Sequence, residues 1–299
     1  MTRKINRYAT FLFFIIILGS FVSCEEETIY TPDERFVLQA YLYANEPVND
    51  VKVHNAIPLT SSDTVGTPIN NAKITLYKND VAYPLISSSD TGTYHYSGDD
   101  LIIKTGETFY IEATVDNKSV NATTTVPNAP QGVKMSTERV ELPEITIDPY
   151  TGRPDMYAFR QILGMQGSVQ LEVIWDNLEG ELHFVVIENA EDNQESIFPD
   201  IGGKFGQIGR GAFHRITFPT RESSYQINFR EIKYWGKYMV KVYRVNQEYA
   251  DLYDNLEQDS RDLNEPPTNI KNGLGIFSAF NSQTVYFEVV KQGSNPDGW

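Results

Sequence analysis

The sequence has 299 residues, a formal net charge of −15 and a single cysteine. Such an acidic chain repels nucleic acid and anionic lipid headgroups, which argues against a DNA- or RNA-binding role. Because one cysteine cannot form a disulfide within the chain, stability must come from hydrophobic cores. The 18 tyrosines and 16 phenylalanines favour pleated, half-buried strands.

The first residues have the form of a bacterial lipoprotein signal peptide. Residues 1–23 begin with three basic side chains, continue into an apolar run from Phe11 to Leu18 and end just before Cys24. The whole apolar stretch is about 14 residues, which is short for a transmembrane anchor that needs about 20. An ordinary cleaved signal would leave Cys24 as a thiol beside three acids, an improbable core environment. We therefore expect Cys24 to carry fatty acids such as palmitate and to hold the protein on a membrane.

Three acids directly follow the cysteine, in an acidic tether that spans residues 24–34. Glu25, Glu26 and Glu27 resemble the surface-export signal of Bacteroidota lipoproteins, which are moved to the outer leaflet of the outer membrane. We therefore expect a cell-surface location. The alternative is a solvated tether on a lipoprotein that faces the periplasm.

Residues 35–130 alternate apolar and polar side chains with a period of two. In the segment FVLQAYLY one face begins with Phe36, and the other ends with Tyr41 and Tyr43. Seven or eight such segments separated by turns predict an N-terminal β-sandwich. Its pattern resembles the prealbumin-like and immunoglobulin-like modules of surface proteins, which are usually scaffolds.

Residues 131–156 hold several prolines, glycines and acids, so we expect a linker or an excursion at a sheet edge. A second β-sandwich is expected over residues 157–299. Its strand SVQLEVIWD and the strands that follow resemble fibronectin type III topology, with Trp175 as a core side chain rather than a ligand platform. The expected fold class is thus all-β, with two sandwich domains.

One amphipathic helix is expected within the second sandwich, over about residues 247–262. Tyr249, Leu252, Tyr253 and Leu256 recur at helical spacing, and acids cover the other face. Two further strands should follow the helix, at the ranges Leu274–Phe280 and Thr284–Val290.

No motif in the sequence assigns a reaction. The four histidines, His54, His95, His183 and His214, stand singly and lack the spacing of a zinc site. No GxSxG elbow is present. A pair of glycosidase carboxylates stays open, because separation in space decides it. We expect no enzymatic activity, no catalytic residue and no cofactor.

Two acidic clusters have the composition, but not the order, of calcium sites. Neither Asp99-Asp100 nor Glu191-Asp192 with Glu195 matches the pattern of a calcium-binding loop, so solvated turns are expected and no metal site is assigned.

The glycine-rich segment at residues 202–211, GGKFGQIGRG, superficially suggests a phosphate-binding loop. Its lysine is followed by Phe205 rather than by serine or threonine, and no apolar helix follows. A flexible loop or hairpin tip is favoured. Because Phe205, Ile208 and Arg210 are interspersed among the glycines, they are the best candidates for a partner-binding loop.

A more specific resemblance covers nearly the whole chain after the signal. The lipoprotein cysteine with its acids, the segment FVLQAYLYANEPV, the segment PINNAKITLY and the near-terminal NIKNGLGIFSAF together resemble domain of unknown function 4249, a family of Bacteroidota outer-membrane lipoproteins. Asn269-Ile270 and Gly273-Leu274-Gly275-Ile276-Phe277 carry it most clearly. Members are often encoded near TonB-dependent transporters, which implies an accessory role, and the family has no known catalytic residues.

These features favour a surface-exposed outer-membrane lipoprotein that acts as a non-enzymatic accessory subunit of an outer-membrane β-barrel, most directly a TonB-dependent transporter. It would capture substrate, cap the barrel or brace the complex. One alternative is a glycan- or peptide-binding lipoprotein that acts alone, with Tyr94 and Tyr96 as stacking platforms. Another is a structural subunit of an outer-membrane assembly or secretion machine. The sequence identifies neither the barrel nor any small-molecule or glycan ligand.

Overall fold

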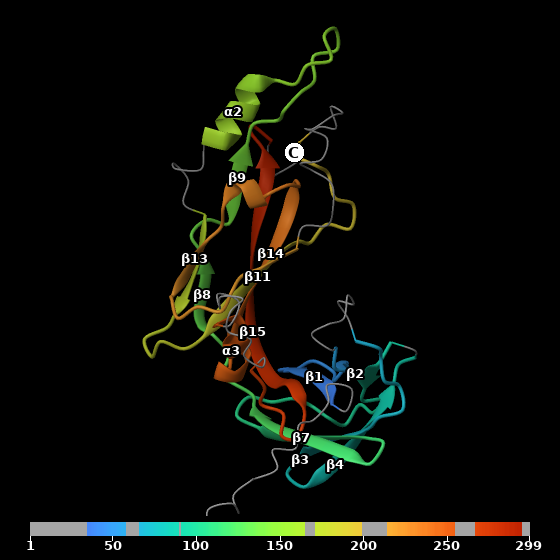
Figure 1. The fold of residues 1–299 in the computed structure, drawn as a ribbon. Coiled ribbons are helices and arrows are strands. Elements are labelled where there is room, and N and C mark those ends of the chain that lie inside the picture. Colours follow the sequence, from blue (N-terminus) through green and yellow to red (C-terminus); the bar gives the residue numbers. More distant parts are fainter. Residues whose placement is uncertain are drawn as a thin grey trace, which may run out of the picture.

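The computed structural model describes the chain in six stretches: residues 35–57, 66–89, 91–164, 171–198, 214–254 and 267–294. Within them the chain is mostly strand, and Figure 1 shows two lobes connected by one long strand. The all-β sandwich class expected from the sequence is confirmed. No helix in the described part of the chain is both long and apolar enough to cross a bilayer.

The N-lobe is a sandwich of seven strands that enclose one core. The strands are β1 (Phe36–Tyr43), β2 (Asp50–Asn55), β3 (Lys73–Lys78), β4 (Val81–Ser87), β5 (Thr93–His95), β6 (Thr108–Val115) and β7 (Lys118–Thr125). Neighbouring strands pair in the order β1-β2-β5-β4-β3-β6-β7. Strand β4 pairs with β3 from Val81 to Leu85 and with β5 only at Ile86 and Ser87, so it passes from one layer of the sandwich to the other at its end. Leu38 of β1 and Phe109 of β6, both fully buried, lie in the same core.

The C-lobe packs a five-strand sheet against a three-strand sheet. Its elements are β8 (Gln131–Met135), β9 (Arg139–Leu142), α2 (Met156–Gly164), β10 (Glu172–Asp176), β11 (His183–Asn189), β12 (His214–Ile216), β13 (Ser224–Gln226), η4 (Phe229–Glu231), β14 (Gly236–Val245) and α3 (Gln247–Asp254). The larger sheet runs β12-β11-β14-β15-β9 and the smaller one β13-β10-β8. The core between them contains Val173, Trp175 and Val240.

Strand β15 (Leu274–Lys291) has 18 residues and belongs to both lobes. Its first part pairs in parallel with β1, up to Tyr43 opposite Phe280. Its second part pairs antiparallel with β14 and then in parallel with β9. In Figure 1 the strand runs the length of the C-lobe and bends into the N-lobe beside β1.

The sequence predicts two separate strands here, Leu274–Phe280 and Thr284–Val290, both within the C-terminal sandwich. The second range lies in the C-lobe along β14, but the two ranges form one continuous strand, and the first pairs with β1 of the N-lobe. Phe277 and Ala279 lie in the N-lobe core, so the N-lobe takes a strand from the far end of the chain. The polar composition of Asn281-Ser282-Gln283 is typical of a turn. It stays extended because Ser282 and Gln283 pair with β14 and the buried Asn281 amide has partners in the N-lobe.

Residues 131–156, expected as a linker or an excursion at a sheet edge, contain two strands. They contribute β8 to the smaller sheet of the C-lobe and β9 to the edge of β15. Helix α2 then begins at Met156, where no helix was expected. The Asp155 carboxylate caps it, accepting hydrogen bonds from the backbone N–H groups of Tyr157 at 2.8 Å and Ala158 at 3.2 Å. The second helix, expected over 247–262, is described over Gln247–Asp254.

Candidate functional site

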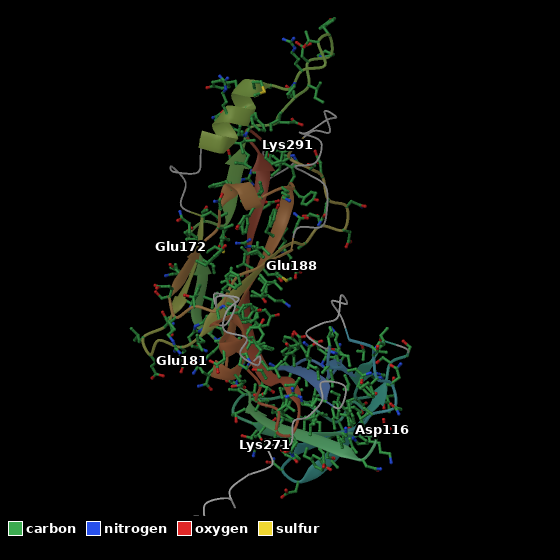
Figure 2. All side chains as sticks on the ribbon, in the orientation of Figure 1. Asp116, Glu172, Glu181, Glu188, Lys271 and Lys291 are labelled. Atoms are coloured by element: carbon green, nitrogen blue, oxygen red, sulfur yellow. The ribbon has the colours of Figure 1, made fainter. Side chains whose placement is uncertain are left out.

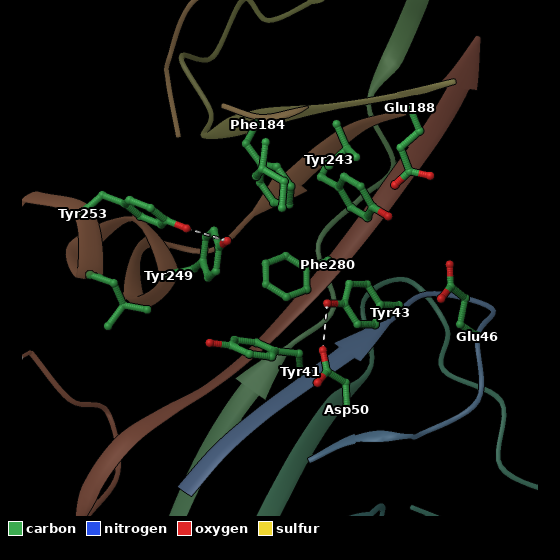
Figure 3. A pocket seen from close by; sticks show the side chains of 13 residues that line it. Tyr41, Tyr43, Glu46, Asp50, Phe184, Glu188, Tyr243, Tyr249, Tyr253 and Phe280 are labelled. Carbon is green, nitrogen blue, oxygen red and sulfur yellow. Dashed lines mark hydrogen bonds between the residues drawn. The ribbon is translucent and has the colours of Figure 1, made fainter. Parts of the chain in front are cut away.

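A cavity of about 320 Å³ lies where the two lobes meet. Aromatic side chains from five elements make up much of its wall: Tyr41, Tyr43, Phe184, Tyr243, Tyr249, Tyr253 and Phe280. Figure 3 shows them converging from β1, β11, β14, β15 and α3, so neither lobe alone forms the cavity. We call it the inter-lobe cavity.

The alternation of strand side chains explains why these rings meet. In β1, Leu38, Ala40 and Leu42 point into the N-lobe core, so Tyr41 and Tyr43 point to the opposite face. In β11, Val185 and Ile187 fill the C-lobe core, which turns Phe184 toward the same place. The second faces of strands from both lobes thus form a third, smaller apolar cluster at the junction.

Phe280 is the centre of this cluster. Its ring stacks on Tyr43 at a centroid separation of 5.2 Å and meets the edge of Tyr249 at 4.9 Å. Phe184 and Tyr243 stack on each other at 4.8 Å. Phe280 is 2% exposed, whereas Tyr41, Tyr43 and Tyr249 are half-buried and face the open part of the cavity.

Helix α3 closes one side of the cavity and is attached to the N-lobe by Glu248. The Glu248 carboxylate accepts hydrogen bonds from the Thr124 hydroxyl of β7 at 2.9 Å and from the Ser278 hydroxyl of β15 at 3.3 Å. On the adjacent face of the helix, the hydroxyls of Tyr249 and Tyr253 lie 3.0 Å apart. The helix directly follows β14 of the C-lobe in the chain, and these hydrogen bonds attach it to the N-lobe as well.

Three carboxylates line the cavity: Glu46, Asp50 and Glu188. The Tyr43 hydroxyl donates a hydrogen bond to Asp50 at 3.2 Å. Burial and the Asp50 carboxylate raise the pKa of Tyr43 well above its usual range. Burial, with the charges of Glu46 and Glu188, raises the pKa of Tyr243 to about 12. Both shifts reflect burial of the phenol first and the neighbouring carboxylates second.

The residues proposed for anchoring, export and partner binding lie outside the described residues. This applies to Cys24, Glu25, Glu26 and Glu27 at the start of the chain, and to Phe205, Ile208 and Arg210 in the glycine-rich segment. The structure therefore tests none of these assignments.

The two tyrosines proposed as stacking platforms differ in how far their rings are exposed. Tyr94 is 1% exposed, and its hydroxyl donates to the Ile69 carbonyl at 2.7 Å while accepting from the Ala72 N–H at 3.0 Å. It is a core residue, which corrects the expectation. Tyr96 is half-buried, packs edge-on against Tyr83 and donates to Asp100 at 2.7 Å.

Trp175 is a core side chain, as the sequence predicted, with 4% exposure. Its ring centroid lies 5.5 Å from that of His183, which is 2% exposed. The His183 Nδ1 lies 3.0 Å from the Glu181 carbonyl, and burial lowers the pKa of the imidazole to about 4. His183 is thus a neutral core residue.

The other described histidines lie in separate places. His54 contacts the Asn55 carbonyl, and His95 the Ser88 hydroxyl. The side chain of His214 lies outside the described residues.

The carboxylate clusters serve local structure. Asp100 accepts from Tyr96, Glu191 accepts from the Lys237 N–H at 2.8 Å, and Glu195 pairs with Lys291 at 2.9 Å. Across the described ranges, no three His, Cys, Asp or Glu side chains gather closely enough to hold a metal ion.

Sequence reasoning did not find the inter-lobe cavity, although two signals pointed to it. The second face of β1 ends in two tyrosines, and α3 carries a stripe of Tyr249, Leu252 and Tyr253 that needs something to pack against. The sequence places the first stripe in the N-terminal sandwich and the second in the C-terminal sandwich. Only the pairing of β1 with β15 brings them to one place.

The near-terminal motif NIKNGLGIF closes the fold. The Asn269 side chain exchanges two hydrogen bonds with the backbone of Phe277, accepting from its N–H at 2.9 Å and donating to its carbonyl at 2.7 Å. Gly275, with φ of +112°, lies so close to β1 that an added Cβ would meet the Leu38 carbonyl oxygen at 2.0 Å. The motif therefore attaches β15 to the N-lobe.

Fold and site together define a two-lobed β-sandwich protein whose lobes share one strand and enclose an aromatic cavity. The chain belongs to the family described as Domain of unknown function (DUF4249), whose model matches residues 23–285. No curated protein matches the sequence.

Several solved structures match the chain at low similarity. A two fibronectin type III domain segment from chicken tenascin is 10% identical, covers 85% of this chain and 99% of its own, and has a TM-score of 0.22. The FN1–FN3 domains of chicken CNTN1 are 11% identical, with 72% and 60% coverage and a TM-score of 0.23. Domains A168–A170 of titin are 12% identical, with 85% and 66% coverage and a TM-score of 0.19. At these TM-scores the likeness carries no conclusion about the fold or the function.

Proposed function

We propose that the protein is a lipid-anchored lipoprotein on the outer face of a bacterial outer membrane. There it acts as a non-enzymatic accessory subunit of an outer-membrane β-barrel, most directly a TonB-dependent transporter. The observation that carries the proposal is the family match, which starts at residue 23, beside Cys24. The resemblance implies Bacteroidota lipoproteins encoded near such transporters and assigns no catalytic residue.

The length of the tether supports a position close to the membrane. Eleven residues separate Cys24 from β1, which begins at Phe36. Since an extended chain spans about 3.3–3.6 Å per residue, β1 lies at most about 40 Å from an acylated Cys24. The N-lobe and the inter-lobe cavity would then be within reach of the extracellular mouth of a barrel in the same membrane.

The shared strand suits a bracing or capping role. Because β15 pairs with β1 in one lobe and with β14 in the other, a force on either lobe passes directly through strand hydrogen bonds. Two lobes joined by a flexible linker would move independently, whereas these lobes share a strand, a helix contact and a cavity.

Co-purification tests the proposal. The chain with a C-terminal affinity tag is purified from its native host in mild detergent, and its partners are identified by mass spectrometry. We expect stoichiometric recovery of one β-barrel protein. A Cys24→Ala variant serves as the control, because it leaves the folded lobes unchanged and should lose membrane association. Recovery of the tagged chain as a lone monomer would reject the subunit role.

Protease treatment of whole cells tests the surface location. External protease should digest the protein, and replacement of Glu25, Glu26 and Glu27 by alanine should protect it by keeping it on the periplasmic side. If the unchanged protein resists protease until the outer membrane is opened, the surface assignment is wrong.

A second candidate function is a binding lipoprotein that acts alone. The inter-lobe cavity favours it, because half-buried tyrosines beside carboxylates are typical of ligand-binding pockets. This candidate differs from the first in one observable: the purified monomer would bind its ligand fully without a barrel.

A further inference from the structure

The inter-lobe cavity offers polar groups as well as rings. Five tyrosines and three carboxylates are among the side chains that line it. The Tyr43 hydroxyl donates to Asp50 at 3.2 Å, and the hydroxyls of Tyr249 and Tyr253 lie 3.0 Å apart. A phenol both donates and accepts, and a carboxylate accepts at about four positions, so these groups can bond further partners. A ligand in the cavity therefore meets hydrogen-bond donors and acceptors between the rings.

The carboxylates can bind a hydroxyl without being free of other contacts. Asp50 pairs with Lys52 at 3.6 Å and still accepts the hydrogen bond from Tyr43. Because a carboxylate has two oxygens, an ion pair elsewhere does not use up its capacity as an acceptor. Recognition in the cavity can therefore rest on hydrogen bonds and ring contacts, whatever the net charge around it.

Half-buried rings supply the apolar part of the site. Tyr41, Tyr43 and Tyr249 present such rings to the open part of the cavity. The face of an aromatic ring carries partial negative charge, so it attracts C–H groups, whose hydrogens are weakly positive. A pyranose has C–H groups on its flat faces and hydroxyls around its edge. One sugar ring can thus contact the tyrosine rings and hydrogen-bond to the polar groups between them.

The aromatic surface continues outside the cavity at Phe218. This ring is 68% exposed, and its centroid lies 5.5 Å from that of Tyr253, which lines the cavity. The cavity volume of about 320 Å³ is at the lower end of the range for ligand pockets, about 300–1,000 Å³. A small cavity with an exposed ring beside it suits a chain of sugars, with one unit inside and the next against Phe218.

Other ligand classes match fewer of these groups. A phosphate only accepts hydrogen bonds, as the carboxylates of the wall do, and an ammonium group only donates them. An apolar molecule would cover the hydroxyls and carboxylates without giving them partners, which costs free energy. A peptide backbone donates and accepts, but it offers the rings no flat face of C–H groups. A neutral sugar provides donors, acceptors and that face together.

We propose that the inter-lobe cavity binds one neutral pyranose unit of an oligosaccharide. The tyrosine rings contact its C–H face, the phenols and carboxylates bond its hydroxyls, and Phe218 contacts the next unit. The inference rests on the second candidate function, a binding lipoprotein, and names the ligand class of the same cavity. It does not depend on a barrel partner, because every residue involved belongs to this chain.

Glycan binding by the full lipidated chain tests the proposal. The detergent should be a polyoxyethylene type, since maltosides and glucosides carry sugar headgroups. The protein is applied to an array of neutral oligosaccharides and, in parallel, to an array of peptides. The strongest sugar is then titrated by calorimetry beside sorbitol, which has the hydroxyls of a hexose but no ring. We expect that sugar to bind at least tenfold more tightly than sorbitol.

Matched variants assign the binding to the cavity. Tyr41→Leu removes one ring of the wall and should weaken the bound sugar about tenfold. Tyr110→Leu, the same substitution at an exposed tyrosine of β6, should leave binding unchanged. Phe218→Ala, at an exposed position, should weaken the oligosaccharide but not the single sugar that fills the cavity. Thermal melts of each variant confirm that the fold is retained.

The outcomes separate the sugar assignment from the binding function. Equal binding of sorbitol, or sugar binding that neither Tyr41→Leu nor Phe218→Ala weakens, would overturn the proposal. Peptides bound in place of sugars would overturn the sugar assignment and leave the second candidate function standing. If no ligand of either kind binds up to about 10 mM, both are rejected.

Discussion

The Asn281 side chain donates a hydrogen bond to the carbonyl oxygen of Pro127 at 3.0 Å, across 154 positions of sequence. Asn281 lies in the middle of β15, where the strand leaves β1 and continues along β14, and it is 5% exposed. The same amide donates to the Thr105 hydroxyl at 2.8 Å. One polar side chain thus joins the end of the N-lobe to the strand that crosses into the C-lobe. Figure 2 shows how densely side chains fill both lobes around this strand.

Asn281→Leu should destabilise the protein by about 1 kcal/mol, because the half-buried Pro127 carbonyl loses the donor that the buried Asn281 amide supplies, while the exposed Thr105 hydroxyl can bond to water instead. Urea unfolding followed by circular dichroism measures the change. Gln283→Leu is the matched control, since Gln283 is exposed on the same strand and should change the free energy of unfolding by no more than about 0.5 kcal/mol. Equal effects of the two substitutions would show that the Asn281 amide does not join the lobes.

Gly275 is the second residue on which the junction depends. Its φ of +112° suits glycine, and an added Cβ would meet the Leu38 carbonyl oxygen at 2.0 Å. Gly275→Ala must therefore move β15 away from β1, and we expect a loss of more than about 3 kcal/mol or failure to fold. Thermal melting of the purified variant, or its yield from cells, measures this.

Gly293→Ala separates the steric clash from the backbone strain. Gly293 also has a positive φ, +81°, but nothing lies within 4 Å of its added Cβ. We expect a cost of only about 1 kcal/mol there. Comparable costs at Gly275 and Gly293 would indicate that the contact with Leu38 relaxes freely.

Local patterns predicted much of the fold. The alternation in Phe36–Tyr43 gave β1 its buried and half-buried faces, and Trp175 lies in the core as its strand implied. Such features follow from side-chain periodicity, which acts over a few residues. Helix α2 was not predicted, because the capping residue Asp155 is only a weak signal of a helix start in the sequence.

The junction was not predictable in the same way, because it depends on contacts between residues far apart in sequence. Nothing local to Leu274–Phe280 shows that this segment pairs with β1 rather than with a neighbour in sequence. From the sequence alone Asn281 is typical of a turn, because the two acceptors of its buried amide lie far away along the chain. The cavity was missed for the same reason, since it forms only when that strand is shared.

Glu248 offers a test of how α3 is held over the cavity. Its carboxylate accepts hydrogen bonds from Thr124 and from Ser278, which is fully buried. Glu248→Ala should cost about 1–3 kcal/mol, because these hydroxyls lose their acceptor, and should loosen the helix. Acrylamide quenching of tyrosine fluorescence should then increase as Tyr249 becomes more accessible.

Asp251→Ala is the control for this helix, since Asp251 accepts a hydrogen bond only from the exposed Gln247 among the contacts described for it. It should leave quenching unchanged. If Glu248→Ala also leaves quenching unchanged, the carboxylate is not what positions α3.

His183 should make stability depend on pH in the mildly acidic range. Burial beside Trp175 lowers the pKa of its imidazole from 6.5 to about 4. Between these values the unfolded chain binds a proton that the folded chain does not, so the free energy of unfolding decreases as pH falls. The stabilisation is complete above pH 6.5 and should decline by about 2 kcal/mol on going to pH 5. Urea unfolding at a series of pH values measures the slope.

Two variants show whether that slope belongs to His183. His183→Gln keeps an N–H donor for the Glu181 carbonyl, 3.0 Å from the imidazole Nδ1, but cannot titrate, so its stability should be nearly constant between pH 6.5 and pH 5. His95→Gln replaces an imidazole of the N-lobe, beside Ser88, and should keep the slope that His183 contributes. NMR titration of the His183 ring protons in the unchanged protein gives an independent measurement even if the His183→Gln variant folds poorly. An NMR titration midpoint near pH 6.5, or an unchanged slope of stability against pH in His183→Gln, would contradict the prediction. Either result would mean that the imidazole accepts its proton while the C-lobe core stays folded.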